Sequence, residues 1–405
     1  MLCRKTPWRL VTPQFISPAI LFAGLTAASV VSAANWEIAP RVQAGYRYSD
    51  NYHLGPPGTE VEVSGGEADA QVAFRTLDPR TQIEITPRVQ ATYFPNTDED
   101  EDAVDGYLNA RFEDVTPRRR MGVEGNFSHE DVVRSELPEG GDAGSGDLGN
   151  PADGDSGRFV EHNTRDYILV SPFIRYDVTQ RQRLDFEAHY VRAEFDKQLE
   201  NAQQDWSEEG VSAGWGYQFS PRSTLTLRGT ASRYETTFDT DGYGAYLQWD
   251  TNFTENSRVY VRLGGQQNEP ENGESDTNVI GGVGGSWNSQ RNTLFVDLTR
   301  TVEPISAGTI VERYQLRMQI DHEVSPRVSL QLGARASRDE DLNTAGTFAT
   351  RKYAAAEGGF EWRVLRDFAV TATYSYRWQE FADELSDRSA NGFLVGFVYE
   401  PRRVD

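Results

Sequence analysis

The feature that most constrains this chain is the stretch from Val211 to Arg233, in which apolar residues recur at every second position. Trp215 and Tyr217 alternate with glycine and glutamine, and after a Ser-Pro-Arg segment Leu227 continues the same alternation between Thr and Arg. A period of two is typical of a strand with one apolar and one polar face, and the proline-containing segment indicates a turn. A similar sequence recurs from Val324 to Arg338. The sequence therefore predicts a repeated β-hairpin.

Further segments of the same period follow residue 36, and their connections alternate between short and long. A soluble β-helix or sandwich has no reason to keep this alternation, whereas outer-membrane barrels place tight turns in the periplasm and long loops outside. A barrel strand needs only about 9–11 residues, so a mean hydropathy of −0.61 is compatible with a membrane protein. We predict an all-β fold, a transmembrane antiparallel up-and-down β-barrel of about 18 strands with short periplasmic turns and long acidic extracellular loops. The expected strands are 36–48, 66–76, 82–94, 106–114, 120–130, 166–178, 183–195, 209–219, 224–234, 243–253, 258–266, 278–288, 292–301, 313–323, 328–338, 352–364, 368–378 and 390–399.

The N-terminus has the pattern of a secretory signal. Arg4, Lys5 and Arg9 precede an apolar run, and small residues end it near Ala33. The expected division is a signal peptide over 1–33 and a barrel over 34–405. The single cysteine, Cys3, lies in the segment to be removed, so no disulfide is expected in the mature chain.

The charge balance argues against nucleic acid as a partner. Removal of the three signal-peptide cations takes the formal net charge from −22 to −25, while phosphate binding needs an excess of Lys and Arg. The expected location is the outer membrane of a Gram-negative bacterium. The expected partners are outer-membrane lipid and lipopolysaccharide, the outer-membrane assembly machinery, and a polysaccharide or small hydrophilic solutes.

Aromatic residues on the apolar parity gather at the segment ends, as the two interface girdles of a membrane barrel require. The predicted girdle consists of Trp215, Tyr217, Trp249, Phe253, Trp287, Trp362, Tyr374, Tyr376, Trp378 and Tyr399.

The opposite parity predicts the lumen face, on which nearly all cations are arginine. Two interpretations stay open: a solute path in which guanidinium groups hold carboxylates, phosphates or sugar hydroxyls, or cross-strand ion pairs that hold the wall together. The predicted lumen-lining residues are Arg41, Arg47, Arg75, Arg88, Arg111, Arg175, Arg228, Arg262, Arg317, Arg335, Arg363, Arg377, Glu84, Glu187, Asp297 and Glu361.

The long connections are acidic, above all Asp98–Asp102 and the connection 131–165. Their spacing matches no defined metal loop, so no metal and no cofactor is expected. The connection 131–165 either stays a solvated loop or folds into the barrel mouth and narrows it. No histidine stands near a serine or acid in a recognisable catalytic spacing, so the chain is not expected to be an enzyme. The Gly281–Gly285 run lacks the helix and the Lys of a phosphate loop.

Two short motifs carry a family resemblance. Tyr46-Arg-Tyr-Ser-Asp-Asn-Tyr52 resembles the Tyr-x-x-Asp-Asn opening of a group of outer-membrane β-barrel porins, some encoded with exopolysaccharide export systems, and Asn391–Tyr399 is similar to their closing strand. The chain departs from the pattern by continuing past Tyr399 through Glu400–Asp405.

Three functions follow from these observations. The first is a water-filled channel for hydrophilic solutes with porin-like diffusion. The second is an outer-membrane duct for export of an anionic exopolysaccharide, which predicts a continuous arginine track instead of pairs. The third is a non-conducting surface structural or adhesive barrel. The sequence leaves open the transported solute, an open or plugged pore, and monomer or trimer.

Overall fold

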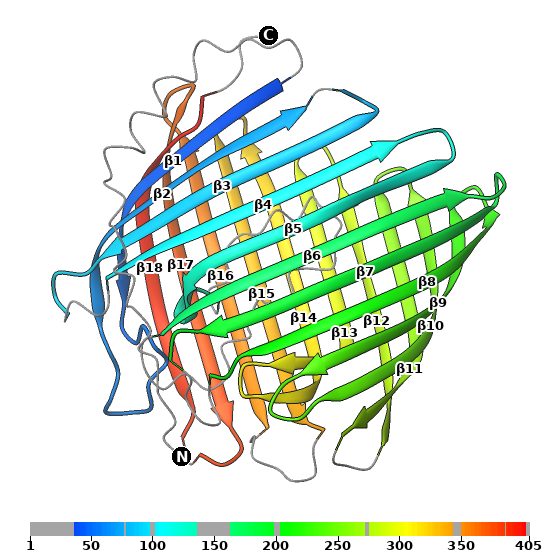
Figure 1. Ribbon diagram of the computed structural model, residues 1–405. Coiled ribbons are helices and arrows are strands. Elements are labelled where there is room, and N and C mark those ends of the chain that lie inside the picture. The colour runs from blue at the N-terminus through cyan, green and yellow to red at the C-terminus, as the bar shows by residue number, and fades with distance from the viewer. Residues whose placement is uncertain are drawn as a thin grey trace, which may run out of the picture.

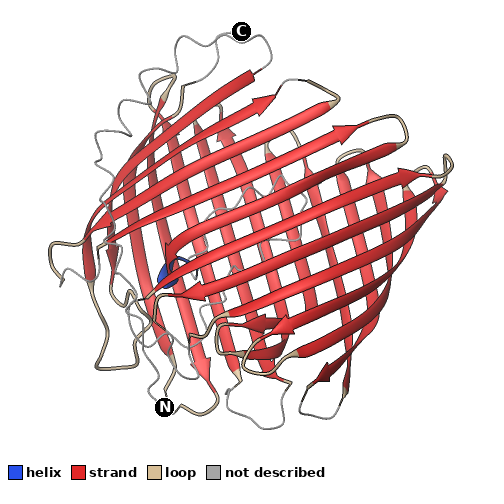
Figure 2. Cartoon of the chain, in the orientation of Figure 1, coloured by secondary structure: helices blue, strands red, loops and turns tan. Residues whose placement is uncertain are grey.

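The computed structural model describes residues 36–76, 78–97, 102–135, 163–197, 203–271, 275–342, 350–384 and 386–401. The predicted signal peptide, most of the acidic run 98–102 and residues 136–162 lie outside the described residues. The described chain forms strands and one short helix (Figures 1 and 2). The elements are β1 (Trp36–Ser49), β2 (Val63–Thr76), β3 (Thr81–Tyr93), β4 (Ala103–Val115), β5 (Arg119–Asp131), α2 (Val132–Ser135), β6 (Thr164–Asp177), β7 (Gln182–Phe195), β8 (Trp206–Ser220), β9 (Ser223–Glu235), β10 (Thr240–Thr254), β11 (Ser257–Pro270), β12 (Asp276–Asn288), β13 (Asn292–Ile305), β14 (Thr309–Ser325), β15 (Val328–Asp341), β16 (Arg351–Arg363), β17 (Phe368–Phe381) and β18 (Arg388–Tyr399).

All eighteen strands belong to one closed antiparallel sheet. Each strand pairs with the next along the chain, and β1 pairs with β18, from Val42 opposite Tyr399 to Ser49 opposite Gly392. The sheet therefore has no free first and last strand, and the predicted eighteen-stranded up-and-down barrel is confirmed. Closure satisfies the backbone hydrogen bonds within the sheet, which a segment crossing lipid requires.

The outer wall of the barrel is apolar. Trp215, Leu227 and Trp362 are 46%, 54% and 47% exposed, and the apolar residues of the same parity on other strands are exposed with them. Large exposed apolar side chains on one face of every strand form a lipid-facing belt, so their alternating neighbours face the interior. None of the described segments is a helix long and apolar enough to cross a membrane.

The connections alternate in length as predicted, with two exceptions. The turns 221–222 and 326–327 are at the short-turn end, while 50–62 and 132–163 are at the long-loop end. In outer-membrane barrels these ends are periplasmic and extracellular, respectively. One exception is the expected long connection between 301 and 313, which is a continuation of β13 and β14 closed by residues 306–308. The other is the connection 236–239 between β9 and β10, which is no longer than the turn 364–367 at the opposite end.

The glycine-rich segment is strand β12, and its glycines make room for neighbouring side chains. Tyr260 on β11 and Asp297 on β13 both lie opposite Gly284 in the register. The Tyr260 hydroxyl reaches across β12 and donates a hydrogen bond to Asp297. A Cβ on Gly284 would come within 2.6 Å of both side chains, so glycine is required for this cross-strand contact.

The motif Tyr46–Tyr52 lies where the barrel closes. The Asp50 carboxylate accepts hydrogen bonds from the backbone N–H and the side-chain amide of Asn391, both at 2.7 Å. Asn51 donates to the backbone oxygens of Gly55 and Ser389. The motif thus joins the first strand to the last at the extracellular end.

Candidate functional site

The interior of the barrel carries most of its arginines in ion pairs. Most of the pairs join adjacent strands, because the closed register brings opposite charges within reach. Arg111 and Glu113 pair within β4, and the pair of Arg228 with Glu187 spans β8. The pairs are Arg47 with Glu67, Arg75 with Glu84 at 2.7 Å, Arg88 with Asp69 at 2.6 Å, Arg111 with Glu113 and with Glu124 both at 3.3 Å, Arg175 with Asp185 at 3.6 Å, Arg228 with Glu187 at 3.0 Å, and Arg317 with Asp297 at 3.5 Å. Arg363 and Glu361, 3.0 Å apart, pair within β16.

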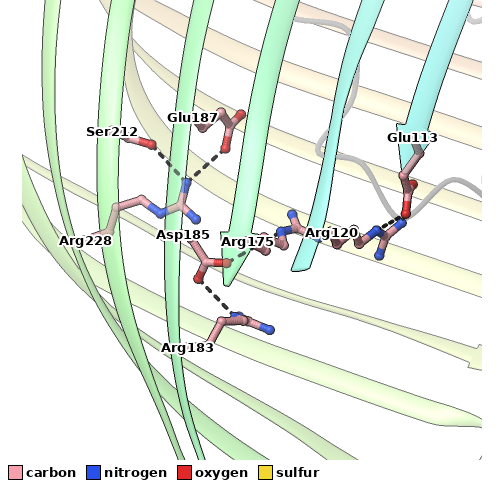
Figure 3. A network of polar contacts seen from close by, with 8 residues as sticks. All are labelled: Glu113, Arg120, Arg175, Arg183, Asp185, Glu187, Ser212 and Arg228. Atoms are coloured by element: carbon pink, nitrogen blue, oxygen red, sulfur yellow. Dashed lines mark hydrogen bonds and ion pairs between the residues drawn. The ribbon is translucent and has the colours of Figure 1, made fainter. Parts of the chain in front are cut away.

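Figure 3 shows the densest part of this network, on β4 to β9. Asp185 lies between Arg175 and Arg183, and Arg228 donates to Glu187 at 3.0 Å and to Ser212 at 3.1 Å. Arg120 pairs with the buried Glu113. The guanidinium groups are therefore held against the wall by fixed carboxylates.

The other predicted lumen arginines have different surroundings. Arg377 donates to the backbone oxygen of Tyr52 at 2.8 Å, and the guanidinium of Arg335 lies 5.1 Å from the Tyr353 ring centroid. Among the described residues, no carboxylate forms an ion pair with Arg41 or Arg262, and the Nε atom of each is buried without a hydrogen-bond partner. A role of the whole set in a solute path stays a prediction.

The extracellular mouth is narrowed first by the connection 50–62. Tyr52 and Leu54 are 1% and 3% exposed, and Leu54 packs against Tyr353 and Ala390 on the inner faces of β16 and β18. Leu54 has a φ of 53°, a left-handed conformation that is costly for a branched residue. Arg377 and Arg388 bond the backbone of this connection from β17 and β18. The segment is therefore fixed against the inner wall.

The second inward segment is α2, at the start of the connection 131–165. Val132 packs with Tyr167 and Trp206, on the inner faces of β6 and β8, while Val133 packs with Tyr52 and Phe94. The described start of this connection is thus buried inside the mouth, which is one of the two arrangements that the sequence left open. Figure 2 shows the helix, in blue, within the outline of the barrel.

The third inward segment is the tip of the β13–β14 hairpin. It lies across the extracellular ends of β8 and β9 (Figure 1), where the Gln204 N–H donates to the Ser306 oxygen at 2.6 Å and the Thr237 N–H to Gly308 at 3.2 Å. Val302 and Ile310 pack on Tyr234 of β9. Residues on both faces of the tip are buried, which explains why the period of two is lost there and why the sequence predicted a loop.

The predicted girdle residues lie on the outer wall, some near strand ends and some closer to the middle of a strand, such as Tyr374 on β17. Trp215 stacks on Tyr217 with ring centroids 6.1 Å apart, and Phe368 contacts Tyr399 at 5.0 Å. Trp378 donates its indole N–H to Asp387 at 2.8 Å. The remaining girdle residues are exposed to a similar degree: Trp249, Phe253, Trp287, Trp362, Tyr374 and Tyr376.

Two histidine–carboxylate pairs were not predicted from the sequence. The His129 Nδ1 atom lies 2.6 Å from Asp166 on the outer wall, and the His189 Nε2 atom lies 2.9 Å from Glu208 in the lumen. Both are contacts between adjacent strands, so the partners are distant in sequence and only the strand register reveals them. The expectation that the chain is not an enzyme stays a prediction. Within the described ranges, no group of three or more His, Cys, Asp or Glu side chains is placed to hold a metal ion.

At the short-turn end, the inner wall has a polar hollow of about 330 Å³. Asp321, Gln331 and Arg363 line it, together with the turns after β12 and β14. Its lining mixes both charges, so the hollow has no dominant sign of charge.

Comparison with known proteins finds only distant structural similarity. Neither a protein-family model nor a curated protein sequence matches the chain. The solved structures similar to it include Pseudomonas aeruginosa OccK2 (OpdF), with 10% identity over 91% of this chain and 98% of that chain and a TM-score of 0.47. A BenF-like porin from Pseudomonas fluorescens Pf-5 has 9% identity over 90% and 99% with a TM-score of 0.47, and Acinetobacter baumannii OccAB3 has 10% identity over 90% and 99% with a TM-score of 0.44.

The assignment rests on the barrel itself. Its closed sheet, lipid-facing apolar belt, charged interior and alternating connections are those of a Gram-negative outer-membrane barrel. The chain is therefore an outer-membrane β-barrel of eighteen antiparallel strands.

Proposed function

We propose that this barrel is a narrowed water-filled channel for small hydrophilic solutes. The observation that carries the proposal is the polarity of the interior, where ion pairs such as Arg88–Asp69 and Arg228–Glu187 line the wall of a closed sheet. Barrels with about 16–18 strands enclose more space than wall side chains fill, so water accompanies these charges. The inward segments at the mouth restrict the path to small solutes.

The pairing of the arginines favours diffusion over polysaccharide export. An export duct for a polyanion predicts a continuous track of arginines that are free to hold successive acidic groups. Instead, Arg47, Arg111 and Arg317 each have a protein carboxylate within 4 Å, which compensates their charge locally. The link to exopolysaccharide export therefore stays a prediction of the sequence resemblance alone.

A non-conducting barrel is the second candidate, and the buried mouth favours it. Val132, Leu54 and Ile310 belong to three separate apolar clusters around the mouth. A barrel closed at this mouth would serve through its surface.

Planar-bilayer recording on the purified full-length mature protein tests the proposal. We expect steady single-channel steps in potassium chloride, with modest ion selectivity because the wall charges are paired. Swelling of proteoliposomes in small sugars but not in large dextrans should accompany these steps. A folded protein that gives neither conductance nor swelling would contradict the channel and support the structural barrel.

A further inference from the structure

Tyr260 lies flat against the inner wall of the barrel. The Cε1 side of its ring lies above Gly284, and its Cε2 atom is 3.6 Å from the position of a Cβ on Gly282. The hydroxyl is bonded to Asp297 on the strand beyond, so the ring is held at its far end as well. Because one ring face rests on β12 and the residue points inward, the other face is directed to the lumen.

Arg262 is the next inward-facing residue on the same strand, and within the described ranges no carboxylate forms an ion pair with it. Arg258, on the other side of Tyr260, pairs with Asp250 at 2.8 Å, while Asp297 is 3.5 Å from Arg317. The guanidinium of Arg262 lies 5.3 Å from the Tyr246 ring centroid, and its Nε atom is buried without a hydrogen-bond partner. A planar fork of donors is therefore available beside a ring face.

The wall beside Arg262 offers the amide of Gln248, whose nitrogen donates to Asp250 at 2.9 Å and whose oxygen is the group left to accept a hydrogen bond. Gln248 lies directly opposite Arg262 on β10, and Gly282 lies opposite it on β12. Above this level Ile280 packs on the cluster formed with the β13–β14 hairpin. The wall at Tyr260 and Arg262 is thus directly below the inward hairpin, where a solute that has passed the mouth meets it.

We propose that Tyr260 and Arg262 form a subsite for sugar acids, that is, saccharides with a carboxylate. The carboxylate takes the two parallel hydrogen bonds that Arg262 offers. The apolar C–H face of the sugar ring packs on Tyr260, and a sugar hydroxyl group donates to the side-chain oxygen of Gln248. An aromatic carboxylate would also stack, but it would leave this oxygen unused. The inference rests on the proposed channel and names one class of its solutes.

The test is block of the ionic current through the purified full-length mature barrel by added solutes. Glucuronate should block in a saturable manner, while glucose and benzoate should block at least about tenfold more weakly, because glucose lacks the carboxylate and benzoate lacks the hydroxyl groups. Arg262→Gln should weaken the glucuronate block by about tenfold or more. Tyr260→Leu should weaken it as well, whereas Tyr260→Phe keeps the ring and should retain most of it.

Arg228→Gln is the matched control. It removes a lumen arginine on β9 that is held by Glu187 and Ser212, so we expect less than about a twofold change in the glucuronate block. Each variant is accepted only if it shows the heat-dependent electrophoretic shift of a folded barrel.

The outcomes separate the subsite from the channel. Conductance without glucuronate block, or equal effects of Arg262→Gln and Arg228→Gln, overturns the subsite and leaves the channel intact. Equal block by benzoate and glucuronate overturns the assignment to sugars. If the folded barrel does not conduct, the channel fails, and calorimetric titration of the detergent-solubilised protein with glucuronate still decides whether Arg262 binds it.

Discussion

The wall and the mouth of this barrel use the same residue types in opposite ways. In the wall, Arg75 and Glu84 form a pair whose side chains are 47% and 40% exposed. At the mouth, Arg313 and Asp339 form a pair whose side chains are 3% and 1% exposed. Water screens the first pair, and burial makes each charge in the second depend on its partner. The difference indicates that substitutions of charged residues in the wall have small effects on stability, whereas the mouth is a packed core in which they have large ones.

The largest effect is expected from Arg313→Met, which leaves Asp339 and Glu303 buried without their cation. Breaking a buried pair by removing one partner costs about 3–5 kcal/mol. We expect a lower midpoint of urea unfolding, followed by the heat-dependent electrophoretic shift. The double variant Arg313→Met with Asp339→Leu should recover part of the loss, and no recovery would argue against a packed polar core at the mouth.

A smaller effect is expected from Gly308→Ala at the tip of the hairpin. Gly308 has a φ of 75°, and a Cβ there would lie 2.4 Å from Gln204 and 2.5 Å from Thr237. The substitution costs about 1 kcal/mol or more and loosens the tip, so single-channel conductance should rise. Gly333→Ala, where a Cβ has nothing within 4 Å, should leave conductance unchanged. If Gly308→Ala has the same single-channel conductance as the unchanged protein, the tip does not restrict the path.

Asp50→Ala is expected to weaken the place where the barrel closes. It removes both hydrogen bonds to Asn391, at a cost of about 1–3 kcal/mol. The midpoint of thermal unfolding should fall. The midpoint of Asp50→Asn, which keeps one acceptor for the Asn391 backbone, should lie between those of Asp50→Ala and the unchanged protein. A midpoint equal to that of the unchanged protein would mean that the β1–β18 register alone closes the barrel.

The smallest effect is expected from Arg75→Gln in the wall. Exposed pairs contribute about 0–1 kcal/mol, so the unfolding midpoint should hardly change. The reversal potential in a salt gradient should move slightly toward cations, because Glu84 loses its partner. A loss of stability comparable to that of Arg313→Met would erase the distinction between wall and mouth.

The wall was predictable from sequence because its two faces have different surroundings along every strand. Lipid on one side and water on the other impose a period of two, and a one-residue slip would reverse every side chain. Parity therefore placed Trp215 outward and Arg228 inward. The parity of a residue does not identify its ion-pair partner. The bond of Arg228 to Glu187 spans three strands and depends on the register of both strand pairs.

The mouth was not predictable in the same way. Between Val302 and Arg313 both faces of the hairpin are buried, so no alternation separates inside from outside and the segment resembles a loop. The glycines of β12 were also not explained by the local sequence. Gly284 is required because the Tyr260 side chain of the neighbouring strand lies over it, and not because the chain turns there. A sequence pattern indicates whether a residue faces lipid or water. It gives no such indication where both faces of a strand pack against protein.

The pairing of β1 with β18 has a consequence for how the chain is ordered. In a ring of consecutive hairpins, the position of the first residue is only a matter of where the ring is cut. Trp36 and Tyr399 both lie at the rim of short turns, so joining these ends and opening the turn at 221–222 would preserve every neighbour in the sheet. The order of strand synthesis could thereby be changed while the finished ring stays the same.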